Sequence, residues 1–155
     1  LLCSRRMATR EMLGLVDWHL ITLFLSLFIV VRALETTGLP AQAVAALDRA
    51  GLPLASSAVL IPFSAALSNI VSNVPAVMLL LGHLPTDNPV PWYVLALAST
   101  LAGNLILLGS IANLIVAEQA AACGVRFSFR EHARTGVPVT LVTLLITGLW
   151  VWLAG

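Results

Sequence analysis

Two short polar stretches interrupt apolar sequence of membrane length, and they constrain the fold of this chain more than any other feature. One covers residues 67–75 and reads LSNIVSNVP, and the other covers residues 102–113 and reads AGNLILLGSIAN. A bilayer offers no water to backbone N–H and C=O groups, so irregular backbone persists there only inside protein or beside a cavity. Two such interruptions in one chain predict a polar solute site at mid-membrane depth.

The composition is that of an integral membrane protein. Of the 155 residues, 59% are hydrophobic and 10% are charged, whereas a soluble domain carries about 25% charged residues. No basic patch with interleaved aromatic residues occurs, so nucleic acid is not indicated as a partner. Histidines and cysteines lack metal-binding spacing, and no nucleophile–base pair is visible, so we expect neither a metal centre nor an enzyme. Cys3 and Cys123 are far apart and are expected to be free thiols.

Charged residues divide the chain into four apolar blocks, which predict an all-α membrane fold. The first block starts at Trp18 and is long enough to span only if Arg32 and Glu35 reach toward the interface and the helix continues to Thr37. In all, about three transmembrane helices and one re-entrant helical hairpin are expected. The predicted elements are a transmembrane helix at 18–37, an interfacial helix at 41–50, a re-entrant hairpin at 54–82, a broken transmembrane helix at 91–122 and a transmembrane helix at 135–154.

The second block, residues 52–86, predicts the hairpin. It carries no formal charge and is too long for one crossing, yet it has no polar loop that would separate two crossings. We expect arms at 54–67 and 75–81 and an irregular tip at 68–74. Pro75 suits the first turn of the returning arm, where the N–H that proline lacks is not needed.

The third block predicts a broken helix. Gly103-Asn104 and Gly109-Ser110 lie in its middle, and glycine is a poor helix former. We expect half-helices at 91–102 and 111–122, joined by an unwound segment.

The arginines indicate the orientation. They form one cluster near the start and another before the last block: Arg5, Arg6, Arg10, and Arg126, Arg130, Arg134. Three spans and one re-entrant hairpin put both clusters on the cytoplasmic side, as the positive-inside rule requires, whereas four full spans would separate them. We therefore expect a multi-pass protein of the cell (inner) membrane, with the N-terminus in the cytoplasm and the C-terminus outside.

The polar side chains of the two breaks form the candidate site for a small anion or cation. The binding residues assigned are Ser68, Asn69, Ser72, Asn73, Asn104, Ser110 and Asn113, with Pro75, Gly103 and Gly109 shaping the backbone. Half-helix N-termini at Pro75 and Ile111 would favour an anion, whereas unwound carbonyls near Asn73 and Leu107 could coordinate sodium. For Ser68 and Asn69, a role in shaping the tip is as well supported as a role in binding. Isolated glycine or serine residues in membrane helices often serve close helix packing instead.

These stretches resemble the ion transporter superfamily of arsenite permeases, D-type sodium–proton antiporters, and citrate and dicarboxylate carriers. Residues 72–75 resemble its Ser/Asp-Asn hairpin-tip motif, residues 103–118 are similar to the unwound-helix motif of the arsenite-permease-like branch, and residues 16–38 resemble the first helix of the second repeat. The resemblance implies two inverted repeats, each with a hairpin, a broken helix and half of the site, and an elevator-like movement. Residues 1–155 resemble the C-terminal repeat only, as a single membrane domain.

Two departures from the family pattern affect the functional hypotheses. Ser72 stands where the antiporter branch typically has Asp, and Ile106 stands where Thr is frequent, which removes a proton carrier and a hydroxyl ligand. The first hypothesis is a secondary active transporter of an inorganic or organic anion or of sodium. Its site would be completed by an N-terminal half or by a second copy of the chain, and sodium as a coupling ion is the one cofactor considered. The alternative is a non-transporting membrane fragment or assembly subunit.

Overall fold

The computed structural model describes residues 14, 16, 18–126 and 128–154 of the chain. The described part is helical and contains no strand. Its elements are α2 (Trp18–Thr36), α3 (Leu39–Arg49), α4 (Ser57–Val71), α5 (Asn73–Leu81), α6 (Val90–Ala102), the 3-10 turn η1 (Leu107–Gly109), α7 (Ile111–Ala122) and α8 (Phe129–Ala154). Within this part, α2 and α8 are long and apolar enough to cross a membrane. The predictions for Cys3, Arg5, Arg6 and Arg10 lie outside the described residues.

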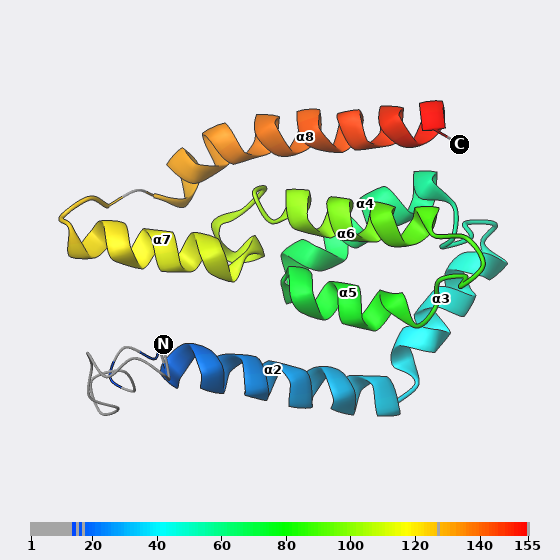
Figure 1. Ribbon diagram of the computed structural model, residues 1–155, viewed down its shortest axis with the longest axis horizontal. Helices are drawn as coiled ribbons and strands as arrows, with labels where there is room; N and C mark the ends of the chain where they lie inside the picture. The colour runs from blue at the N-terminus through cyan, green and yellow to red at the C-terminus, as the bar shows by residue number, and fades with distance from the viewer. Residues whose placement is uncertain (1–13, 15, 17, 127, 155) are drawn as a thin grey trace, which may run out of the picture.

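Apart from α3, which runs obliquely, the helices lie roughly along one long axis of the molecule (Figure 1). Helices α6 and α7 follow one another along this axis, with the second break between them near the middle. Helix α4 runs beside α6 in the same direction, and α5 returns the opposite way, so the pair occupies about half of the length. Helix α8 packs against α4 and α6, and α2 packs against α5.

The apolar core lies between α4, α5 and α6, toward the ends of these helices that are remote from the breaks. Its buried members are Leu54, Leu60, Leu80, Leu84, Val94 and Leu95. Closer to the breaks, small side chains take over, and Ala76, Ala98 and Ala102 are fully buried. Small residues let helix backbones approach closely, which is how helices associate where apolar surface gives little net drive. The close approach brings side chains of one helix within reach of carbonyls of the next.

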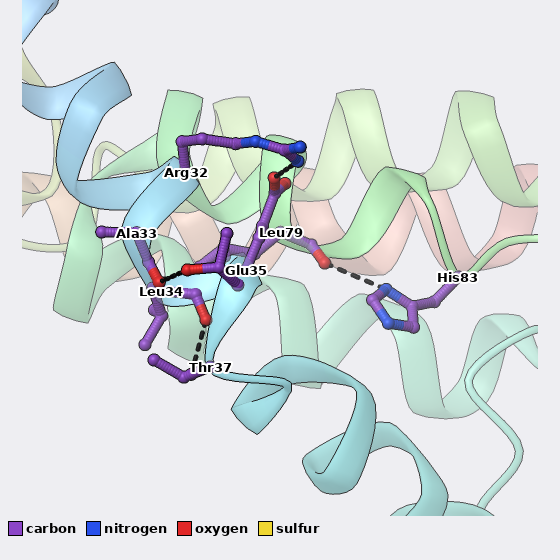
Figure 2. Close-up of polar contacts among 8 residues, drawn as sticks. Arg32, Ala33, Leu34, Glu35, Thr37, Leu79 and His83 are labelled. Atoms are coloured by element: carbon purple, nitrogen blue, oxygen red, sulfur yellow. Dashed lines mark hydrogen bonds and ion pairs between the residues drawn. The ribbon is translucent and has the colours of Figure 1, made fainter.

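Helix α2 ends one residue before the predicted position. Gly38 adopts the left-handed conformation, with φ 73°, that commonly terminates a helix. In the last turn, Arg32 pairs with Glu35 at 3.0 Å, and the Thr37 hydroxyl donates to the Leu34 carbonyl at 2.6 Å (Figure 2). The same view shows His83, at the end of α5, with Nδ1 3.1 Å from the Leu79 carbonyl oxygen.

The tip of the α4–α5 pair is much shorter than predicted. The sequence predicted irregular backbone over 68–74, but α4 stays helical to Val71 and α5 begins at Asn73. Only Ser72 leaves the helical conformation, and it is the one described non-glycine residue with positive φ, at 75°. Ser68 and Asn69 remain helical because their side chains find carbonyl partners on α6. Their polarity therefore serves contact between helices and does not unwind the chain.

The later elements follow the prediction more closely. The half-helices α6 and α7 match the predicted ranges to within one residue. Helix α8 begins at Phe129, earlier than the predicted 135, because a capping box starts it. The backbone N–H and hydroxyl of Ser128 donate to the Glu131 carboxylate at 2.6 and 3.0 Å, and the Glu131 N–H donates to the Ser128 hydroxyl at 3.3 Å. The added turn carries His132 to the second break.

The hydroxyl of Ser68 generates a stability prediction. It is fully buried and donates to the Ser99 carbonyl of α6 at 2.8 Å. Ser68→Ala should lower the free energy of unfolding by about 1 kcal/mol, because a bond between helices is lost. This free energy can be measured by titrating the protein in mild detergent with sodium dodecyl sulfate and monitoring unfolding by circular dichroism. Ser64→Ala is the matched control, since Ser64 is equally buried but donates within its own helix. Equal losses in both variants would contradict the prediction.

Candidate functional site

The second break lies beside the last turns of α4. The turn η1 of the second break contacts α4, and Asn69 near the end of α4 joins them. The Asn69 amide nitrogen donates to the carbonyls of Ala65 and Ala102, at 2.9 and 3.0 Å. The amide oxygen faces Gly109 so closely that a Cβ added to that glycine would lie 2.6 Å from it. Residues about forty positions apart thus meet at one point.

The oxygen of that amide has no hydrogen-bond partner. Among the described residues, Asn69 Oδ1 is the one buried side-chain polar atom of this kind. An unsatisfied buried acceptor costs about 1–3 kcal/mol, so such an atom indicates either strain or a ligand-binding role. The Gly103 carbonyl oxygen would lie 3.2 Å from the same hypothetical Cβ. Two oxygens, one of an amide and one of the backbone, therefore occupy the space that a Cβ at residue 109 would need.

The end of α6 is held by side chains from three other helices. A helix leaves its last carbonyls without a helical N–H partner. Here five carbonyls over residues 99–104, all but that of Thr100, accept side-chain bonds from other helices. The donors are Ser68 to Ser99, Thr140 to Leu101, Asn69 to Ala102, Asn113 to Gly103 and a ring nitrogen of His132 to Asn104, at 2.8, 3.5, 3.0, 2.8 and 3.1 Å. We call this set the carbonyl clasp. It fixes where the unwound segment leaves α6.

Within the second break, the backbone folds back on itself. A Cβ on Gly103 would lie 3.2 Å from the Ser110 Cβ and 3.5 Å from the Gly109 carbonyl oxygen. Ile106 and Ser110 have extended backbone on either side of η1. The amide of Asn113, in the first turn of α7, closes the loop by its bond to the Gly103 carbonyl at 2.8 Å. Both glycines are therefore explained by close backbone contact.

At the hairpin tip, the Asn73 carboxamide bonds to its two neighbours in the chain. Its oxygen accepts from the Val74 N–H at 3.0 Å and from the Ser72 hydroxyl at 3.5 Å. Asn73 also lines a cavity of about 260 Å³, together with Ser99 and Thr100 of α6. Pro75 is fully buried in the first turn of α5, as predicted for the returning helix.

The structure divides the predicted site residues. Asn104 lines a different cavity, of about 410 Å³, with Glu131, His132, Thr135 and others from α8. The cavities at Asn73 and Asn104 share no lining residue. The side-chain donors of Ser68, Asn69 and Asn113 are engaged with backbone carbonyls. Asn73 and Asn104 are therefore the predicted residues that line a cavity, and the Ser72 hydroxyl bonds to Asn73.

Sequence reasoning missed the contribution of α8. His132 and Thr140 reach the end of α6, and Gly136 between them is buried against the Asn104 carbonyl. The spacing of four residues places all three on one helix face. That pattern of polar and small residues in an otherwise apolar helix was the available signal.

The chemistry of the two breaks is polar but uncharged. Their side chains are amides and hydroxyls, which can both donate and accept. Helices α5 and α7 run in opposite directions away from the region of the breaks (Figure 1). Helix N-termini carry partial positive charge and favour an anionic oxygen, while the exposed carbonyls of an unwound segment favour a cation.

Comparison with known proteins identifies the family. The family model described as citrate transporter matches residues 1–102, which include α2 to α6. The chain belongs to the citrate transporter family. The resemblance to the ion transporter superfamily, drawn from the two polar stretches, is therefore confirmed, and the chain is an integral membrane protein. No solved structure matches it.

Three relatives extend the similarity across the second break. The chain is 31% identical to an uncharacterized transporter of Mycobacterium tuberculosis, over 92% of this chain and 36% of that protein. It is 36% identical to the silicon efflux transporter of Oryza sativa subsp. japonica, over 84% of this chain and 30% of that protein. It is 33% identical to a Dictyostelium discoideum protein named transporter arsB, over 94% of this chain and 27% of that protein. The chain spans about a third of the length of these relatives.

The contact between Asn69 and Gly109 generates a second prediction. Gly109→Ala should lower the free energy of unfolding by about 1–3 kcal/mol, because the new Cβ meets an amide oxygen whose nitrogen is bonded twice. The same change should cost clearly less in an Asn69→Ala background, where that oxygen is gone. The free energy of unfolding of the two single variants and the double variant, measured by denaturation in detergent, completes this double-mutant cycle. Gly82→Ala is the control, since its Cβ would meet nothing within 4 Å. Additive losses in the double variant would contradict the contact.

Proposed function

We propose that the chain forms the C-terminal half of a secondary active transporter for a small inorganic or organic anion, with sodium as the coupling ion or as an alternative solute. The observation that carries the proposal is the contact of Asn69, three residues before the irregular residue Ser72, with Gly109 of the second break. In a chain of the citrate transporter family, irregular backbone from two elements at one depth is the arrangement used for solute binding in membrane carriers. Ser72, Asn73, Asn104, Ser110 and Asn113 are proposed to line this half of the site, with Ser68 and Asn69 supporting them.

The proposed topology is one half of an inverted-repeat carrier. Helices α4 and α5 enter and leave at the same end of the molecule, and α6 with α7 continues to the other end (Figure 1). This course supports a re-entrant hairpin beside a broken transmembrane helix. The arginines before and within the start of α8 support a cytoplasmic α7–α8 turn, a C-terminus outside and an inner-membrane location.

The proposed solute class follows from the neutral lining. Amides, hydroxyls and helix N-termini can bind the oxygens of an anion without a fixed positive side chain. One relative is named a silicon efflux transporter, and the family model is described as citrate transporter. In water, silicon and citrate both occur as oxygen-rich solutes. The Ser72 hydroxyl does not ionise near neutral pH, so proton coupling through a hairpin-tip acid, as in the D-type antiporters, is not part of the proposal.

The second candidate, an assembly subunit or non-transporting fragment, also has an observation in its favour. No residue of α7 is buried, and large apolar side chains such as Ile115 and Val116 are exposed. Helix α2 is similarly exposed along most of its length. These faces fit contact with an N-terminal half, with a second copy of the chain or with lipid.

The test is transport in proteoliposomes, with the chain alone and with the N-terminal part of the Mycobacterium tuberculosis relative. The probes are radiolabelled citrate, succinate, arsenite and sodium. We expect the wild-type chain to take up one of the probes when the partner is present. Asn73→Ala and Asn113→Ala should each reduce this uptake about tenfold or more, because each removes an amide at a break. Gln42→Ala, which removes an exposed amide on α3 remote from the breaks, is the matched control and should retain uptake.

The outcomes separate the two candidates. Uptake that survives both asparagine variants would contradict the site assignment. Absence of uptake by correctly folded protein, alone and with the partner, would favour the assembly subunit. Uptake by the chain alone would mean that two copies complete the site.

A further inference from the structure

Two members of the clasp around the end of α6, His132 and Thr140, have no part in the proposed binding site, and both come from α8. His132, in the first turn of α8, places Nε2 3.1 Å from the Asn104 carbonyl oxygen. The other clasp donors are hydroxyls and amides on α4, α7 and the middle of α8. The His132 contact is the one that reaches farthest into the unwound segment.

Two features of α8 keep His132 in place. The capping box between Ser128 and Glu131 fixes the first turn of the helix, immediately before His132. One turn later, Gly136 is buried against the same Asn104 carbonyl, in a contact so close that a Cβ there would collide with the oxygen. Because residues four apart share a helix face, His132 and Gly136 hold one carbonyl from two directions.

We propose that His132 is a positioning residue for the second break. With Gly136, it fixes the Asn104 carbonyl and so sets the course of residues 104–110 toward the hairpin tip. The proposal deepens the proposed function, on which its transport readout rests, because those residues carry half of the candidate site. It assigns to α8 a role in solute affinity although no side chain of α8 is among the proposed binding residues.

The cavity beside this contact determines what loss of the imidazole does. The 410 Å³ cavity borders Asn104, His132 and Gly136, so water can reach the carbonyl once the ring is removed. Helices α4, α5 and α6 keep their own core, which lies at the other end. Removal of the ring should therefore loosen the break without unfolding the bundle.

The experiment is hydrogen–deuterium exchange of the full chain in detergent, combined with the proteoliposome assay. His132→Ala should speed exchange of the amides over 104–110 about tenfold while those of α4 to α6 keep wild-type rates. His132→Gln should restore slow exchange, because glutamine supplies an N–H donor at similar reach. Gly136→Ala should act like His132→Ala, because its Cβ pushes α8 off the carbonyl. Gly148→Ala, on the same helix with only Ile61 at 3.8 Å, is the matched control and should behave as wild type.

Transport supplies the second readout. For whichever of the four probes the wild-type protein carries, His132→Ala should raise KM about fivefold and leave the maximal rate nearly unchanged, with rescue by His132→Gln. Wild-type exchange rates in His132→Ala, failure of rescue by glutamine, or equal effects of Gly136→Ala and Gly148→Ala would each overturn the proposal. If the wild-type protein carries no probe, the proposed function fails, and the exchange rates alone still decide the role of His132.

Discussion

The structure depends on how the carbonyls at the end of α6 are satisfied. A helix that stops inside a membrane protein exposes carbonyl oxygens for which lipid offers no donor. Here they are bonded partly by backbone N–H groups of residues 103–105 and partly by side chains from α4, α7 and α8. Three other helices therefore help to stabilise the break. The same bonds fix the relative positions of the hairpin, the two half-helices and the last helix. The site and the tertiary packing therefore have a common origin.

Small residues make these bonds sterically accessible. Ala98 and Ala102 bring α6 close to its neighbours, and Gly109 and Gly136 admit an amide oxygen and a carbonyl at distances that a Cβ would forbid. Glycines in membrane helices have two common roles, in helix breaks and in close packing. At Gly103 and Gly109 both roles coincide, since the backbone is irregular and tightly packed at once. This accounts for glycine at the positions that the sequence singled out as helix breakers.

The polar residues of the two stretches divide into two kinds. In the first kind, the side chains donate hydrogen bonds to backbone carbonyls, as in Ser68, Asn69 and Asn113. Ser72, Asn73 and Asn104 border cavities or the irregular tip. The unpartnered oxygen of Asn69 connects the two kinds, because its nitrogen is structural while its oxygen faces the second break. A carrier that moves a solute needs such a rigid support beside a polar surface that is free to bind.

The sequence by itself determined the helical class, the membrane environment and the bounds of α6 and α7, because apolar block length and Gly-Asn or Gly-Ser pairs are local signals. It also determined the family through the two motifs. It could not determine that α4 remains helical through Ser68 and Asn69, since that depends on carbonyls of α6 about thirty residues away. The early start of α8 had a local signal in Ser128 and Glu131, but the contact of His132 with Asn104 had none. Only tertiary structure decides which polar side chains meet a carbonyl and which face open space, because the partners are distant in the chain.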